Sequence, residues 1–312
     1  MTKGGYVATQ LPSRFIVEMS QRRHRFYHYL WHRVRKSWLR LTEAERRAVR
    51  EINPQWVPPR PALDAAGRPM RENDSGEDFL FMYRQMITNA NDLLARTADP
   101  AYPRVEGWRR VPPPGDAVYQ VPPFPDSELE EVKSAETFEF YIRPWELRYT
   151  DPVYLRGVTL GQLGSDIEFT IHNDLLMRWA APSPVGYRPS KAAEPDIGEQ
   201  WDAPAYNYLG DTYSSCVNPI FWKIHGWVDD RIEDWRRARG LTGEIEWTGT
   251  WVGSPGEGRV RPDQGQRTAS EGATAAAGTL EEWCLIHRII SASAARECDG
   301  FFRPVVRRRM PY

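Results

Sequence analysis

The helix expected over residues 217–238 constrains the fold more than any other part of the chain. Asn218 favours a helix start because its side chain can accept from the first free backbone N–H groups, and Pro219 suits the first helical position. His225 lies at the edge of the apolar stripe and should point inward, as a metal ligand or as a satisfied core histidine. The stripe recurs at helical spacing and consists of Phe221, Ile224, Val228, Ile232 and Trp235.

The rest of the pattern predicts a mainly α fold with long loops and a few short strands. Thr42 and Glu45 form a capping-box pattern, and the helix that they start should stop before Asn53-Pro54. The twenty-six prolines fit long ordered loops over residues 54–76 and 99–126. Further helices are expected from about residue 20 and over residues 79–96, 165–180 and 279–296, and short strands over 136–142 and 145–149.

Charge is unevenly distributed, although the net charge is only −1. Residues 1–60 carry thirteen Lys and Arg and four Glu, so the remainder is acidic. The basic first helix is either a solvated charged face or a contact for a protein partner. The small net charge excludes bulk attraction to nucleic acid or to an anionic membrane. We expect three parts: a basic helical extension (1–41), a helical core (42–238) and a loop-and-helix extension (239–312).

The cysteines and the N-terminal segment bear on the compartment. Cys216, Cys284 and Cys298 are odd in number and unpatterned, which suits a reducing environment. The N-terminal segment lacks the apolar run of a secretory signal, and no stretch approaches the roughly 20 apolar residues of a membrane span. These features predict a cytoplasmic location.

Three of the six histidines are spaced by four residues in the first long helix. His24, His28 and His32 therefore share one face. Phe26, which belongs to the apolar stripe of that helix, lies about 200° around the axis from His28. The pattern predicts surface histidines, with a partner contact or a metal site as alternatives.

Two segments resemble the second copper half-site of the tyrosinase family, the type 3 copper proteins. NPIFWKIHGWVDD is similar to Asp-Pro-x-Phe-Trp-x-x-His-x-x-Val-Asp, which implies that His225 is a metal ligand. LGQLGSDIEFTIHNDLLMRW resembles Glu-x-x-x-His-Asn-x-x-His, which implies the same for His172, whereas Leu176 occupies the next ligand position. The resemblance covers roughly residues 33–236 and implies a tyrosinase-like helical bundle.

The first copper half-site departs further from the family pattern. GEDFLFMYRQMI resembles Phe-Leu-x-Trp/Met-His-Arg, but Tyr83 stands where the family has histidine, and another expected histidine falls near Asp74. An oxygen-activating copper pair needs six imidazoles, so a dicopper site is not expected. His172 and His225 could hold one copper or another transition metal, with help from Asp74, Tyr83 or Met177.

The resemblance also implies roles for Glu168 and Asn173. In copper-bearing relatives the residues at these positions hold a water that takes the phenol proton, and a general base must lie within hydrogen-bond reach of that proton. The alternative is an ordinary exposed Glu and an Asn at a helix start. With Tyr83, these two residues make up the candidate catalytic set.

Three functions are compatible with the sequence. The first is a tyrosinase-like enzyme of specialised metabolism that acts on a small phenol or aromatic amine, with one metal or none. The second is a pseudoenzyme that binds an aromatic ligand, or a partner enzyme through the basic first helix. The third is a haem-based or other metallo-oxygenase drawing on His24, His28, His32 or His287, although the chain has no Cys-x-x-Cys-His attachment motif.

Overall fold

The computed structural model describes residues 10–124, 127–183, 187, 196–248, 251 and 277–296, and these residues form a mainly helical fold, as predicted. Within these ranges the only β-pairing is an isolated antiparallel bridge between Leu63 and Pro69. The same part of the chain contains no helix that is both long enough and apolar enough to cross a membrane.

In chain order the helices are α1 (Ser13–Ser20), α2 (Arg22–Ser37), α3 (Glu43–Ile52), α4 (Ser75–Thr97), α5 (Ser127–Lys133), α6 (Ala135–Thr137), α7 (Arg143–Thr150), α8 (Pro152–Gly157), α9 (Leu160–Ile167), α10 (Asn173–Trp179), α11 (Pro219–Ala238) and α13 (Leu280–Arg296). The helices between residues 127 and 179 follow one another closely, whereas longer segments precede α4, α5, α11 and α13. The π-helical turns η3 (Phe138–Ile142) and η4 (Glu168–His172) join neighbouring helices. The 3-10 turns are η1 (Trp38–Arg40), η2 (Pro54–Trp56), η5 (Glu199–Asp202) and η6 (Ser215–Val217).

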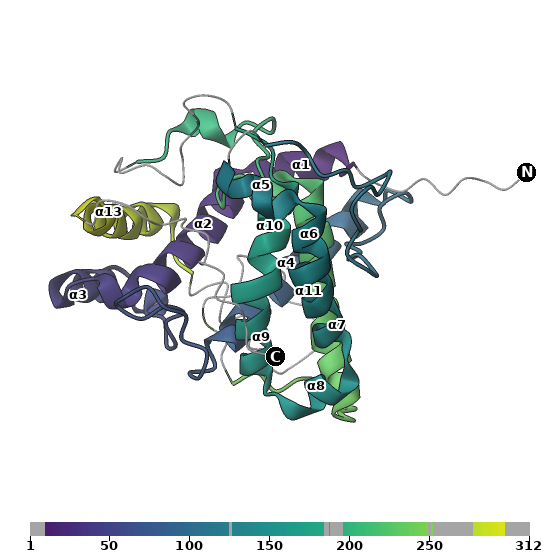
Figure 1. Ribbon diagram of the computed structural model, residues 1–312. Coiled ribbons are helices and arrows are strands. Elements are labelled where there is room, and N and C mark those ends of the chain that lie inside the picture. The colour runs from purple at the N-terminus through teal and green to yellow at the C-terminus, as the bar shows by residue number, and fades with distance from the viewer. Residues whose placement is uncertain are drawn as a thin grey trace, which may run out of the picture.

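A central bundle contains α4, α9, α10 and α11, which run together through the middle of the molecule (Figure 1). Helix α4 packs on both α9 and α11, and α10 packs on α11. To one side, α13 packs on α2 and α3. The structure does not test the division into three parts. The basic tail Arg307–Arg309 and most of residues 239–276 lie outside the described residues.

Local signals set the ends of the helices, as the sequence predicts. The Thr42 hydroxyl accepts from the Glu45 N–H, and the Glu45 carboxylate accepts from the Thr42 N–H, which completes the capping box of α3. The Asn218 side chain accepts from the Ile220 N–H at the start of α11. These caps satisfy N–H groups that have no partner inside the helix.

The surface prediction for the histidine row of α2 is wrong. Phe26, Leu30 and Val34 are buried as expected, but His28 and His32 on the opposite face are only 2% and 8% exposed. Helix α13 covers one side of α2, and the interior of the bundle receives the other. His24 alone is partly exposed, with Nε2 3.6 Å from a Glu18 carboxylate oxygen.

The two short strands predicted over 136–142 and 145–149 are helical instead. The Ser134 side chain caps α6, which continues through η3 into α7. Phe138 and Ile142 lie four residues apart and are both buried. Aromatic and branched side chains therefore fill one helical face here, rather than one face of a sheet.

Helices α4 and α9 touch through their backbones at a pair of glycines. A Cβ added at Gly76 would overlap backbone atoms of Gly161 and Ser165, and one at Gly164 would overlap Gly76. Residues without a side chain are therefore required at this crossing. The close contact fixes how α4 lies against the chain segment that carries His172.

Candidate functional site

His225 lies on α11 with its ring fully buried. Its Nδ1 donates to the Phe221 carbonyl across 2.7 Å, because a carbonyl oxygen can only accept. The Nε2 atom of the neutral ring therefore carries no proton and is available as an acceptor in the interior. This orientation follows from the helix itself, since Phe221 is one turn earlier on the same helix.

His172 ends the π-helical turn η4 and meets His225 across the bundle. The two Nε2 atoms are 2.9 Å apart, so Nε2–H of His172 donates to the lone pair on His225. Single π-helical turns occur frequently at functional sites. The structure thus brings together the two histidines implied as metal ligands.

Tyr83 comes from α4 and lies against the same pair. Its ring stacks on His225, with centroids 3.9 Å apart and an interplanar angle of 21°, and its centroid is 5.6 Å from that of His172. The side chain is 1% exposed. The three groups that the sequence places in one site are therefore neighbours in the interior.

Two further imidazoles join them that the sequence interpretation assigned to the surface. The Tyr83 hydroxyl lies 3.3 Å from His28 Nε2 and 3.0 Å from His32 Nε2. We call His28, His32, Tyr83, His172 and His225 the imidazole cluster. The four-residue spacing of His28 and His32 indicates that they share one face of α2, but it does not indicate that other helices cover this face.

The protons in this cluster can be placed from the backbone. Nδ1 of His28 donates to the Thr212 carbonyl across 2.8 Å, so its Nε2 is an acceptor. The Tyr83 hydroxyl then donates to His28 and accepts from Nε2–H of His32. His32 Nδ1 is buried and has no hydrogen-bond partner within the described part of the chain. The backbone thus fixes two of the four rings, those of His28 and His225.

Burial keeps the rings of the cluster uncharged. It lowers the pKa of His28 to about 4 and that of His172 to about 3, and it lowers the pKa values of His32 and His225 well below the ordinary range. Burial also raises the pKa of Tyr83 well above its usual value. At neutral pH the cluster therefore consists of neutral imidazoles and a protonated phenol.

Glu168, the implied base, is engaged elsewhere. Both of its carboxylate oxygens accept from Nη1 of Arg35, at 2.5 and 2.7 Å, and both side chains are buried. A carboxylate held by a buried guanidinium is poorly placed to take a phenol proton, which argues against a base role. The one sequence feature that could have indicated this ion pair is the position of Arg35, three residues after His32 on the same helix.

The other residues named from the sequence lie outside the cluster contacts. Asn173 begins α10 and Leu176 is partly buried on it. Asp74 caps α4 in a left-handed conformation and accepts from the Thr159 hydroxyl. Met177 is partly buried on α10, with its methyl group near Gly210.

The donor set does not fit a dicopper pair. Among the described residues no three His, Cys, Asp or Glu side chains form a group suited to a metal ion, and the Tyr83 ring and hydroxyl contact both imidazole pairs. A single metal fits one pair better. Two imidazoles that each bind one metal at about 2.1 Å have their nitrogen atoms roughly 3 Å apart. The Nε2 atoms of His172 and His225, 2.9 Å apart, meet that spacing.

The chain matches no protein-family model, and no curated protein matches it significantly. The tyrosinase resemblance therefore rests on the motifs in the sequence, and membership of that family stays a prediction.

Proposed function

We propose that this chain is a tyrosinase-like protein that holds a single transition metal in the imidazole cluster and acts on a small phenol or aromatic amine. One observation carries the proposal. His225 donates Nδ1–H to the Phe221 carbonyl, which leaves its Nε2 without a proton and 2.9 Å from Nε2 of His172. Metal-binding histidines are oriented in this way, and neutral imidazole is the form that binds.

The His172–His225 pair is the better candidate for the metal ligands. Its nitrogen atoms have the spacing of adjacent ligands, and a metal there would replace the hydrogen bond between the two rings once the His172 proton has moved to Nδ1. His28 and His32 are both held by the Tyr83 hydroxyl. Imidazole suits copper, and also iron and zinc. A bound copper would supply Lewis-acid and redox chemistry toward a phenol oxygen. The protein would contribute neutral donors, a dry interior and the Tyr83 ring stacked beside the pair.

Metal analysis of the purified protein, compared with matched variants, tests this proposal. We expect a transition metal, copper before zinc, that is lost in His172→Gln and in His225→Gln. His287→Gln is the matched control, because His287 is a buried imidazole on α13 that contacts Phe26 and Tyr29 instead of the cluster. Equal metal content in all four proteins, or none after incubation with copper, would overturn the proposal.

A second candidate is a non-catalytic protein that binds an aromatic ligand or a partner enzyme. Two observations favour it: Arg35 occupies both oxygens of Glu168, and Tyr83 fills the space between the imidazole pairs. Calorimetric titration of the metal-free protein with simple phenols separates the candidates. Binding without metal and without turnover favours the second, whereas turnover only in the metal-loaded protein favours the first. No contact of His287 or of the α2 histidines favours haem.

A further inference from the structure

Tyr83 has the surroundings of a redox-active tyrosine. It is buried, its hydroxyl donates to His28 Nε2, and that imidazole is fixed by the Thr212 carbonyl. A phenol gives up an electron far more readily when a neighbouring base takes its proton at the same time. The His28 imidazole is therefore placed to take the phenol proton as the electron leaves.

A chain of buried aromatic rings leads away from this tyrosine. The His32 ring, whose Nε2 donates to Tyr83, has its centroid 5.0 Å from that of Trp31. Trp31 lies 5.3 Å from Trp251, and Trp251 lies 6.3 Å from Trp56. At these centroid distances neighbouring rings are in direct contact.

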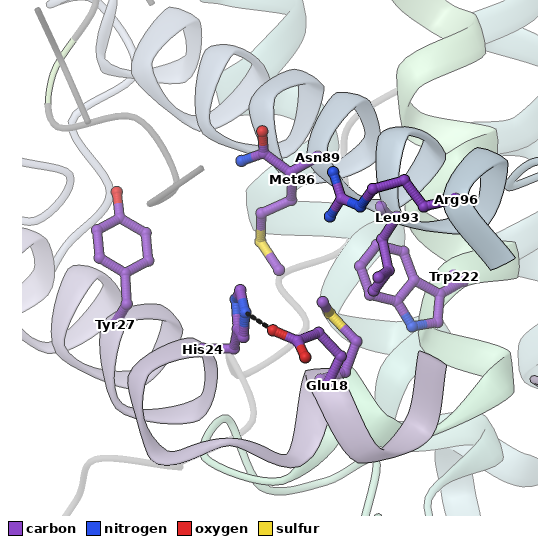
Figure 2. Close-up of a pocket in the computed structure, with 10 residues that line it drawn as sticks. Glu18, His24, Tyr27, Met86, Asn89, Leu93, Arg96 and Trp222 are labelled. Atoms are coloured by element: carbon purple, nitrogen blue, oxygen red, sulfur yellow. Dashed lines mark ion pairs between the residues drawn. The ribbon is translucent and has the colours of Figure 1, made fainter. Parts of the chain in front are cut away.

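The far end of the chain reaches a pocket. Trp56 lies 5.8 Å from the ring of Tyr27, which contributes to the wall of the pocket in Figure 2. His24 and Glu18, drawn as an ion pair there, line the same pocket. Tyr27 therefore connects the tryptophan rings to the wall of this pocket.

The charges around the chain permit a positive hole to pass. Arg35 lies over the Trp31 ring, 5.1 Å from its centroid, and would oppose a cation on that ring. Its charge is offset by the buried carboxylate of Glu168. Trp56 and Trp251 donate their indole N–H groups to the carbonyls of Ala277 and Gln55, and these acceptors hold the rings in place.

We propose that Tyr83 is a one-electron redox centre, connected to the pocket at Tyr27 by the rings of Trp56, Trp251 and Trp31. An outer-sphere oxidant, such as a ruthenium(III) polypyridyl complex, takes one electron from Tyr27 or Trp56 and is reduced to ruthenium(II). The hole moves inward to Trp31. Tyr83 returns an electron to that ring and passes its proton to His28 Nε2, which leaves a neutral tyrosyl radical and an imidazolium.

The experiment uses the full chain after removal of metal by a chelator, so its result is independent of the metal proposal. Flash photolysis generates the ruthenium(III) oxidant, and transient absorption and freeze-quench EPR follow the radicals. We expect a long-lived neutral tyrosyl radical in the wild type that is absent in Tyr83→Phe. Tyr149→Phe is the control, because the buried Tyr149 hydroxyl bonds the Thr170 hydroxyl and the Asp166 carbonyl and has no imidazole partner among the described residues.

Two further variants test the route. Trp56→Phe should slow formation of the Tyr83 radical, because phenylalanine is much harder to oxidise. Trp108→Phe should leave the rate unchanged, since the described ring contacts of Trp108 are with Tyr119 and Trp179, which do not belong to the route from Tyr27 to Tyr83. Circular dichroism must show that each variant is folded. The same radical in Tyr83→Phe, or an unchanged rate in Trp56→Phe, would overturn the proposal.

Discussion

Helix α2 contributes to two buried polar regions that lie one turn apart. The polar groups of one region are uncharged, whereas those of the other are charged and paired. The imidazole cluster receives His28 and His32, which lose their charge, because burial lowers their pKa values. The next turn carries Arg35, whose guanidinium cannot lose its charge and is instead paired with Glu168. A buried polar group must therefore be neutral or compensated.

This contrast explains why Glu168 makes an unsuitable base. Its carboxylate is held by Arg35, and removing it would leave that buried cation without its ion-pair partner and with the neutral Ser75 carbonyl as its acceptor. In the imidazole cluster, by contrast, replacing one side chain leaves no charged group behind, because its imidazoles and phenol are neutral. The predictions below test the two regions from the largest expected effect to the smallest.

Glu168→Gln should destabilise the protein by about 3–5 kcal/mol, because it leaves Arg35 buried and unpaired. Urea unfolding followed by circular dichroism measures the change. In the double variant Arg35→Met/Glu168→Leu most of that loss should disappear, since the two buried charges of the pair are removed together. A double variant as unstable as the single one would show that packing, and not charge, dominates this region.

Stability should fall as the pH drops from about 6.5 to about 4, because burial lowers the pKa of His287 to about 4. Over this range the unfolded chain binds a proton that the folded protein refuses, and this one ring accounts for roughly 3 kcal/mol. His287→Gln should remove this one ring's share of the slope, while the four imidazoles of the cluster, whose pKa values burial also lowers, keep theirs. An identical slope in the variant would contradict the neutral state of the buried ring.

Tyr83→Phe should cost about 1–3 kcal/mol, because His28 and His32 both lose the hydroxyl that satisfies their Nε2 atoms. Thermal and urea unfolding measure the loss. Tyr149→Phe should cost less, since the Thr170 hydroxyl still donates to the Asp166 carbonyl in that variant. Equal losses would mean that the cluster places no special demand on its phenol.

Glu139→Gln removes a carboxylate that pairs with Arg143 at 2.7 Å, closer than many of the interior contacts. Both side chains are exposed, so water and salt already screen the pair, and we expect no measurable change in the urea midpoint. A clear loss there would weaken the view that burial, and not distance, separates the Arg35–Glu168 pair from surface pairs.

Sequence alone predicts the helices whose ends are set by local chemistry. The caps at Thr42 and Asn218 depend only on neighbouring residues, so the starts of α3 and α11 follow from the sequence. Residues 136–149 lack such a decisive signal, because aromatic and branched side chains suit a buried helical face as well as a strand. The helix there becomes evident only when Phe138 and Ile142 are seen buried together.

Only three of the five residues of the imidazole cluster could be predicted from the sequence. Motif resemblance predicted that His172, His225 and Tyr83 share a site. Periodicity predicted that His28 and His32 lie on one face of α2, but it could not predict which residues cover that face. Burial of the histidine face depends on Tyr83 of α4 and on Phe221 of α11, both distant in sequence. The partner of Glu168 was hidden for the same reason, since Arg35 lies 133 residues away along the chain.

The glycine contact between α4 and α9 has a consequence for how such a site could diversify. Gly76 lies seven residues before Tyr83, about 10 Å along the helix, and carries no donor atom. A methyl group at Gly76 would force α4 and α9 apart. Because Tyr83 lies on the same helix, its phenol would then tilt away from the His172 ring. Natural variation at a featureless position could thus retune the chemistry of this interior while every ligand stays the same.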